Sequence, residues 1–419
     1  MTNDAPASAQ TLTGNWLALL VLFGAHVVGS MAFIAIATMA PLIRADLALS
    51  ATGFGFLIWA YFFAQGILAL PIGALIDQFG LRASLFAASA TLALGSALLS
   101  IADDRSFALA AMAVLGIGYC FVNPSTSKGV FLLFPAARRG TAMGIKQSGV
   151  PIGGILGAAL GGLAHIYSWR GLLLVVAAMA VAFAFAGLLL PIRNSGARAS
   201  GAGPRLRALA KSVASVVADR NLTAFNLGAG LYQAAQFSFF GYLTLFLREV
   251  LVFSQPAAAA CLGIAQAASA AGRMSWGAVS DFVFRGRRQP VLVIMTGTAI
   301  TGLLAMAAMA MIGPQPWTQV AAVALAAVLG LSVAGYVALI QTVVVEMADP
   351  EFTATSVAYN RLFVSLGASV GPPLFGLAVD QSGGYMAGWL TAAAFVVCVL
   401  VIFGAVFRER PRGSSKSAG

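Results

Sequence analysis

The sequence predicts an all-α membrane protein with twelve transmembrane helices in two pseudo-symmetric six-helix bundles. Three observations predict this fold class: an apolar composition, a series of long apolar runs, and motifs that occur once in each half. Hydrophobic residues occupy 60% of the 419 positions and charged residues only 9%, far below the roughly 25% of soluble domains. Because about 20 apolar residues cross a bilayer core, the chain has room for a dozen spans and for no sizeable soluble domain.

The predicted spans are apolar stretches bounded by charged residues, glycine or proline. The first six are Trp16 to Ile43, Gly53 to Ile76, Ala83 to Ile101, Phe107 to Phe134, Ala142 to Ile166 and Gly171 to Ile192. The second six are Leu222 to Leu247, Pro256 to Val279, Val291 to Ile312, Gln319 to Val345, Thr355 to Val379 and Ala387 to Phe407. The domains are then a tail (1–15), a bundle (16–192), a basic central loop (193–221), a second bundle (222–407) and a tail (408–419).

The distribution of basic residues predicts the orientation in the membrane. With a cytoplasmic N-terminus, sixteen Lys and Arg residues fall in inner loops and tails, and the outer loops hold only Arg44, Arg105, Arg170 and Arg248. This asymmetry follows the positive-inside rule, so both termini and the central loop are expected in the cytoplasm. The first apolar run is too long for a cleaved signal peptide, and the compact loops favour a multi-pass protein of a bacterial inner membrane.

A glycine and aspartate motif closes the second span and recurs at the eighth. The residues of the motif are Gly73, Asp77, Gly80 and Arg82 in the first half, and Gly277 and Asp281 in the second. Glycine permits close helix contact, and the aspartate can pair with an arginine or with a neighbouring helix N-terminus. A second repeat matches Gly153, Gly157 and Gly162 of the fifth span with Gly367, Gly371 and Gly376 of the eleventh.

The two motifs, the twelve spans and the basic central loop together resemble the major facilitator superfamily, across essentially the whole chain. The resemblance implies two bundles around a central cavity that opens alternately to either side of the membrane. Spans 1, 4, 7 and 10 are expected to line the cavity, spans 2, 5, 8 and 11 to join the halves, and the motif residues to act in gating. The second motif departs from the pattern, because Gly286 lies further from Asp281 than Gly80 lies from Asp77.

Four basic residues fall inside predicted spans, at Lys128, Lys146, Arg273 and Arg361. Each lies roughly 10 to 15 Å from a membrane surface at 1.5 Å per helical residue. An ionised side chain at that depth costs at least ~2.5 to 3.5 kcal/mol, so it normally faces a wet cavity or a partner. The acidic residues all fall at span ends, in loops or in tails. The four cations therefore favour an organic anion as substrate, and structural roles for them remain the alternative.

The two arginines are similar to those of known carboxylate transporters. Arg273 lies four residues before Gly277, which resembles the substrate arginine of oxalate/formate exchangers and monocarboxylate transporters. Arg361 resembles a second cation of the oxalate exchanger, where that residue is a lysine. This resemblance implies that a carboxylate binds between the two guanidinium groups, which suit bidentate recognition.

Further polar side chains are candidates for the same cavity. They are Tyr61, Asn123, Tyr232, Gln233, Gln236, Tyr336, Tyr359 and Asn360, and ordinary packing between helices explains each of them equally well. His26 is a candidate proton carrier because imidazole titrates near neutral pH, with a structural hydrogen bond as the competing interpretation.

These observations favour a secondary transporter of a mono- or dicarboxylate that works by alternating access. A transporter or exporter of a neutral or drug-like solute, with structural cations, and a non-transporting receptor are the alternatives. No grouping of His or Cys indicates an enzyme, a metal site or a cofactor. We expect a monomer in the lipid bilayer, coupled to a proton or a counter-anion, and no nucleic-acid partner, because the basic residues are dispersed between spans.

Overall fold

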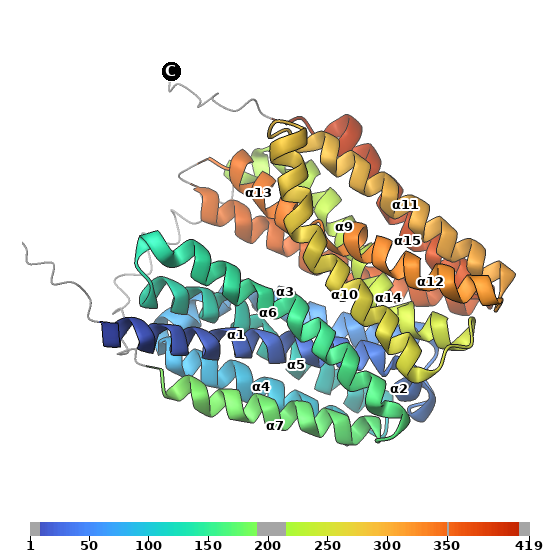
Figure 1. Ribbon diagram of the computed structural model, residues 1–419, viewed down its shortest axis with the longest axis horizontal. Helices are drawn as coiled ribbons and strands as arrows, with labels where there is room; N and C mark the ends of the chain where they lie inside the picture. The colour runs from blue at the N-terminus through green and yellow to red at the C-terminus, as the bar shows by residue number, and fades with distance from the viewer. Residues whose placement is uncertain (1–8, 191–214, 350–351, 410–419) are drawn as a thin grey trace, which may run out of the picture.

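The computed structural model describes residues 9–190, 215–349 and 352–409, which form two bundles that lie one above the other in Figure 1. The first bundle contains α1 (Ala9–Thr38), α2 (Ala40–Asp46), α3 (Ala51–Phe79), α4 (Leu81–Ser100), α5 (Arg105–Leu133), α6 (Ala136–Gly162) and α7 (Trp169–Leu188). The second contains α9 (Arg220–Glu249), α10 (Gln255–Ala278), α11 (Gln289–Ile312), α12 (Pro316–Leu329), α13 (Val337–Met347), α14 (Thr353–Ser382) and α15 (Tyr385–Val401). Residues 191–214 lie outside the described residues, so the limits of the central loop stay a prediction.

Each of the twelve predicted spans coincides with a helix or a pair of helices. The first span divides into α1 and α2, and the tenth into α12, a π-helical turn at Gly330–Ala334 and α13. Ten spans in the described part of the chain are long and apolar enough to cross a membrane. The other two, α9 and α10, have 30 and 24 residues but carry more polar side chains. Such a composition is expected of helices that face a polar interior rather than lipid.

The glycine rows let the first span of each bundle pack closely against its fifth span, which brings α1 against α6 and α9 against α14. A Cβ at Gly153 or Gly157 would lie 2.2 or 2.6 Å from a carbonyl oxygen of α1. In the second bundle, a Cβ at Gly367 or Gly371 would lie 1.8 or 2.4 Å from a carbonyl oxygen of α9. Real side chains do not tolerate such distances, so only glycine fits at these four positions. The two halves therefore use the same packing device at equivalent places.

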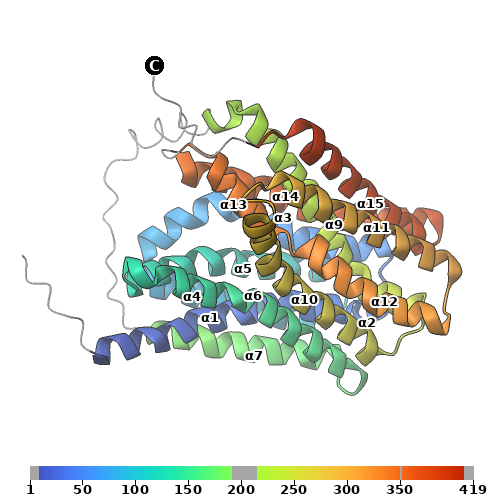
Figure 2. The same cartoon turned by 45° about the horizontal axis from the view of Figure 1, so that its top comes forward.

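Helices α3 and α14, and α6 and α10, join the two bundles, and α6 and α10 lie side by side in Figures 1 and 2. The bundles bond to each other near Arg44, at the end of the molecule where α2 lies, which we call the Arg44 end. Arg44 pairs with Glu249 at 2.8 Å, and Tyr242 donates to the carbonyl of Ala51 at 2.7 Å. The side chain of Asp380 accepts from the backbone amides of Ala51 and Thr52 at 3.0 and 2.8 Å. These bonds must break if the bundles separate at this end.

Asp380 caps the N-terminus of α3 from the other half of the protein, so Asp380→Asn should loosen the Arg44 end. A carboxylate at a helix N-terminus contributes roughly 0.5 to 1 kcal/mol, and its loss should raise the population of molecules open at this end about two- to fivefold. Spin labels at Tyr167 and Trp317, one in each bundle, would report this as a larger share of long distances. Asp104→Asn is the matched control, because Asp104 caps α5 within one bundle. An unchanged distance distribution in Asp380→Asn would contradict the prediction.

The motif residues lie at the opposite end, which we call the Arg288 end. Gly73 and Asp77 belong to α3, but their side chains lie outside the described residues. Gly80 ends α3 with a φ of 83°, a conformation that glycine adopts without strain, and Arg82 donates to the carbonyl of Leu190. Gly277 makes no close helix contact in this structure, because a Cβ there would meet no described atom within 4 Å, and the gating role of the motif residues stays a prediction.

The second motif is distorted by a π-helical turn at Val279–Val283, which includes Asp281. A π turn takes up one more residue than an α turn. Gly286 has a φ of 83°, the same as Gly80, but its amide donates to the carbonyl of Ser280, six residues back, whereas the amide of Gly80 donates to that of Ile76, four residues back. The π turn takes up one of the two additional residues that separate Gly286 from Asp281.

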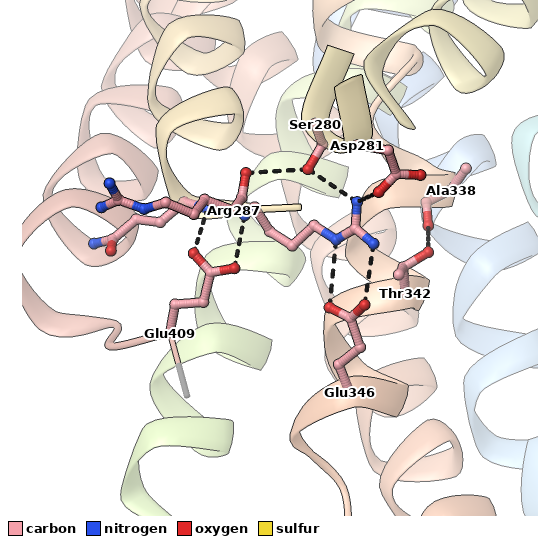
Figure 3. A network of polar contacts seen from close by, with 9 residues as sticks. Ser280, Asp281, Arg287, Ala338, Thr342, Glu346 and Glu409 are labelled. Carbon is pink, nitrogen blue, oxygen red and sulfur yellow. Dashed lines mark hydrogen bonds and ion pairs between the residues drawn. The ribbon is translucent and has the colours of Figure 1, made fainter. Parts of the chain in front are cut away.

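Asp281 takes part in an ion-pair network centred on Arg288. Figure 3 shows Ser280, Asp281 and Glu346 around one guanidinium group, which belongs to Arg288. The distances are 2.9 Å to Ser280, 2.5 Å to Asp281 and 3.0 Å to Glu346. The bond to Glu346, aided by Asp281, raises the pKa of Arg288 despite its burial. The network holds the end of α10 to α13 within the second bundle.

Replacing Arg288 with Gln should destabilise the second bundle, because Asp281 and Glu346 then lose their shared partner. Both carboxylates are partly exposed, so we expect a loss of only ~1 to 3 kcal/mol. The measurement is the thermal unfolding midpoint of the purified protein. Arg287→Gln is the control, because the neighbouring Arg287 side chain is exposed. Equal midpoints for the two variants would show that the network does not stabilise the fold.

Candidate substrate cavity

A cavity of about 440 Å³ lies between the two bundles. This volume is within the range of roughly 300 to 1,000 Å³ that small-molecule sites occupy. Its lining residues come from α1, α3, α5 and α6 in the first bundle, and from α9, α10, α13 and α14 in the second, with Tyr336 just before α13. These helices correspond to spans 1, 2, 4, 5, 7, 8, 10 and 11. The spans that the family resemblance predicts at the cavity all contribute to it.

Arg273 and Arg361 both line the cavity, from α10 and α14. The lining residues include no Asp or Glu, and neither guanidinium has a carboxylate partner among the described residues. The Nε atom of Arg273 is buried without a hydrogen-bond partner. A buried guanidinium donor without an acceptor is costly, and a bound carboxylate would relieve that cost. The cavity thus presents two cations to which the described residues give no counter-charge.

Lys146 and Lys128, the other two cations of the spans, do not line the cavity. Lys146 is fully buried behind the wall, where Nζ donates to Asn123 Oδ1 at 2.7 Å, Ser127 Oγ at 3.0 Å and Gln147 Oε1 at 3.2 Å. Lys128 Nζ donates to the carbonyl of Ile76 at 3.2 Å, near the end of α3. Cations at a helix C-terminus are favourable, so this bond supports a structural contribution of Lys128.

The tyrosine candidates separate into two that line the cavity and two that do not. Tyr61 and Tyr336 line the cavity, and the hydroxyl of Tyr336 donates to Gln233 Oε1. Tyr232 lies behind Tyr336, with ring centroids 4.2 Å apart, and donates to the carbonyl of Ser332. Tyr359 is placed elsewhere, with its hydroxyl 3.2 Å from Thr223 Oγ1. Tyr232 therefore supports the cavity wall, and Tyr359 bonds α14 to α9.

The wall is rich in carboxamides, which sequence reasoning recognised only in part. The predicted residues Asn123, Gln233, Gln236 and Asn360 line the cavity, together with Gln65, Gln147, Gln266 and Gln341. Tyr119 adds a further hydroxyl. The other glutamines could have been predicted from one feature of the sequence. An isolated Gln inside an apolar span costs free energy unless it has a polar partner, so each of them indicates a polar environment.

His26 lines the cavity from α1 and is almost fully buried. Its Nδ1 atom lies 3.2 Å from Thr126 Oγ1 on α5. The Thr126 hydroxyl donates to the carbonyl of Val122, so it can accept from His26. This is the interhelical bond that the structural interpretation of His26 requires. A proton-carrying role for His26 stays a prediction.

Aromatic rings from both bundles pack at the side of the cavity that faces the Arg44 end. The rings of Phe62 and Phe237 have centroids 4.0 Å apart, and Phe33 lies 5.4 Å from Phe237. All three residues line the cavity and come from α1, α3 and α9. Rings from both bundles therefore meet each other at the cavity wall, next to the lining amides Gln65 and Gln236.

Two six-helix bundles with a polar cavity between them define a polytopic membrane transporter fold. The chain belongs to the Major Facilitator Superfamily, whose family model matches residues 21–322 and 276–419. This match confirms the superfamily resemblance and the predicted fold class, and it identifies a multi-pass membrane protein. Fold and relatives are those of transporters and not of enzymes.

The relatives include three named carboxylate transporters. A hexuronate transporter of Bacillus subtilis (strain 168) is 25% identical over 392 residues, which cover 90% of this chain and 91% of the relative. Monocarboxylate transporter 13 of Bos taurus is 25% identical over 78% of this chain and 74% of its own length. A probable L-galactonate transporter of Escherichia coli (strain K12) is 24% identical over 74% and 70%.

Two solved structures show the same fold. A bacterial homologue of the human lysosomal transporter Spinster, in an inward-facing and unoccupied conformation, superposes with a TM-score of 0.74 at 18% identity. The match covers 95% of this chain and 97% of that one. A mutant of the nucleoside transporter NupG gives a TM-score of 0.78 at 15% identity, over 93% of this chain and all of that chain. At these identities the likeness describes the fold alone.

Proposed function

We propose that this transporter carries a small organic anion with at least one carboxylate, by alternating access. The observation that carries the proposal is the pair Arg273 and Arg361 in a cavity whose lining includes no acidic residue. Such a cavity is electrostatically unfavourable when empty and attracts an anion. Arg273 supplies an unpartnered donor, so a bidentate bond to a carboxylate requires no existing ion pair to break.

The relatives support the same class of substrate. Hexuronate, galactonate and monocarboxylates differ in size and hydroxylation, but each carries a carboxylate. Two guanidinium groups can bind a carboxylate through charge-assisted, bidentate hydrogen bonds, which a neutral solute cannot form.

The two ends of the molecule differ as alternating access requires, with one end closed between the bundles in this conformation. The bundles bond to each other at the Arg44 end, where Arg44, Tyr242 and Asp380 form links between them. We propose that the cavity communicates with the Arg288 end in this conformation, and that this end faces the cytoplasm with both termini. We also propose that the protein acts as a monomer in a bacterial inner membrane, with a proton, through His26, or a counter-anion as the coupled species.

Uptake into proteoliposomes tests the proposal. Vesicles that contain the purified protein and are loaded with one unlabelled carboxylate should accumulate the same labelled carboxylate by exchange. Neutral polyols and organic cations of similar size should neither be taken up nor compete. Exchange of a polyol at the same rate would favour a transporter of neutral solutes, and saturable binding without any flux would favour a receptor.

A further inference from the structure

We propose that the transported anion is a hydroxylated carboxylate, and that Lys146 sets this selectivity by fixing the carboxamides of Asn123 and Gln147. The inference rests on the proposed function, because it concerns which carboxylates the same cavity prefers. It assigns Lys146 a positioning role behind the cavity wall rather than a contact with the substrate.

Lys146 determines how the two amides are turned. Its ammonium group has three donors and no acceptor, so the atoms that face it must be oxygens. It donates to Asn123 Oδ1 at 2.7 Å and Gln147 Oε1 at 3.2 Å, and Ser127 takes the third bond at 3.0 Å. The amide nitrogens of Asn123 and Gln147 therefore point away from Lys146. Because the three hydrogens of Lys146 are all in use, the residue has none left for a substrate anion.

The two amide nitrogens belong to residues that line the cavity, and no protein acceptor is described for either of them. An N–H group in this place binds an oxygen of the substrate. The arginines that would hold the carboxylate lie on α10 and α14, in the second bundle. The amides of Asn123 and Gln147 lie on α5 and α6, in the first bundle. The amides of Asn123 and Gln147 are thus placed to contact a part of the substrate other than its carboxylate.

The amides of the second bundle are also held in one orientation. The oxygen of Gln233 accepts from the Tyr336 hydroxyl, which leaves the Gln233 nitrogen as a donor. The nitrogen of Asn360 donates to Asn226 Oδ1 at 2.9 Å, which leaves the Asn360 oxygen as an acceptor. The wall thus combines donors and acceptors on side chains that other residues have already oriented.

Two further amides in the wall are buried with an unpartnered atom. Gln65 on α3 is 6% exposed and its Nε2 donor has no partner, and Gln236 on α9 is 3% exposed and its Oε1 acceptor has none. One is a donor from the first bundle, and the other is an acceptor from the second. Hydroxyl groups both donate and accept, so a molecule with several hydroxyls satisfies both kinds of atom.

These contacts distinguish a hydroxylated carboxylate from a plain alkyl carboxylate. An alkyl chain in the cavity would displace water from the amides and leave their donors and acceptors unpaired. A site built to hydrogen-bond a substrate hydroxyl rejects an analogue that lacks it far more strongly than an apolar pocket rejects a wrong size. The cavity should therefore prefer hydroxy acids at equal carbon number.

The test compares probes that differ in one group at a time. D-Gluconate, hexanoate and sorbitol share a six-carbon chain, and lactate, propionate and glycerol share a three-carbon chain. The concentration that gives half of the maximal thermal stabilisation is measured for each probe on the purified full-length protein. At one chain length or both, the hydroxy acid should act at a concentration at least tenfold below that of the matched plain acid. Equal potency of the two acids at both lengths would overturn the inference.

The same series separates this inference from the proposed function. If the polyol stabilises the protein as well as the hydroxy acid does, or if no acid stabilises it, the proposed anion transport itself fails. If both acids stabilise it equally and the polyol has no effect, anion transport stands and only the hydroxyl preference fails.

The role of Lys146 is tested by one ratio: the half-maximal concentration of the plain acid divided by that of the hydroxy acid with the same chain length. In Lys146→Met the ratio should fall at least threefold, because the amides of Asn123 and Gln147 are no longer held. A direct contact of Lys146 with the carboxylate would instead weaken both acids and leave the ratio unchanged, which would overturn the positioning role. Lys128→Met is the matched control and should keep the ratio of the parent protein.

Gln147→Leu provides a second route if Lys146→Met does not fold. It removes one oriented amide and leaves Lys146 with Asn123 and Ser127, so the ratio should fall at least threefold. A ratio equal to that of the parent protein would show that this amide does not meet a substrate hydroxyl.

Discussion

Arg273→Gln should reduce carboxylate exchange in proteoliposomes by about 100-fold, the largest effect that we expect of a substitution in the cavity. Loss of one partner of a buried, hydrogen-bonded charge pair costs roughly 2 to 5 kcal/mol, and ~3 kcal/mol corresponds to about 100-fold. The guanidinium lines the cavity, and its Nε atom has no partner within the protein. The substitution should therefore weaken substrate binding and leave the fold intact.

The measurement is the initial rate of exchange at a low concentration of labelled carboxylate, with the thermal midpoint of the empty protein as a control for folding. Arg273→Lys keeps the charge but loses the bidentate geometry, so its rate should lie between those of the parent and Arg273→Gln. Arg361→Gln should impair exchange in the same direction. Exchange that survives both Gln substitutions would mean that the two cations are structural and that the substrate is held elsewhere.

Gly367→Val should prevent the second bundle from packing, so that little folded protein is recovered. A Cβ at Gly367 would lie 1.8 Å from the carbonyl oxygen of Gly230 on α9, and this oxygen belongs to the backbone. Neither helix can relieve the overlap by turning a side chain, so α14 and α9 would have to separate along their length. We expect the substitution to lower the free energy of unfolding by more than ~3 kcal/mol, at the upper end of the range for overpacking substitutions.

The yield of monodisperse protein after detergent extraction measures this effect. Gly277→Ala is the matched control, because a Cβ there would meet no atom within 4 Å. It should fold normally, and the lower flexibility of alanine in the unfolded chain should even stabilise it by ~0.4 to 1 kcal/mol. Normal recovery of Gly367→Val would show that α9 and α14 are not held at the described distance.

The sequence predicted the helices and their packing well, because both depend on local composition. A run of about 20 apolar residues crosses a bilayer irrespective of its neighbours, so the twelve spans could be assigned one by one. The glycine rows were also legible, since Gly153 and Gly367 repeat at equivalent positions in the two halves. Gly277 shows that a glycine permits a close contact without requiring one, because no described atom would meet a Cβ there.

The candidate site was predicted less completely. The four cations lie at similar depths in the spans, and of these Arg273 and Arg361 line the cavity whereas Lys128 and Lys146 do not. Lys146 lies one residue from the lining residue Gln147, and its ammonium bonds behind the wall. Sequence spacing gives the depth of a residue, but the rotation of its helix and the rotamer of a long side chain decide where the charge lies.

The sequence by itself determined the membrane class, the twofold repeat, the superfamily resemblance and an excess of cations over anions within the spans. These properties are sums over residues or local patterns, so they do not depend on how the helices meet. Only the tertiary structure decided which bundle faces carry the amides, which atoms remain without partners, and at which end the bundles bond to each other. Those features arise between helices, whether consecutive in the chain, as α5 and α6 at Lys146, or distant in it, as α3 and α14 at Asp380. A hydrogen bond depends on distances and directions between such helices, which local sequence patterns do not contain.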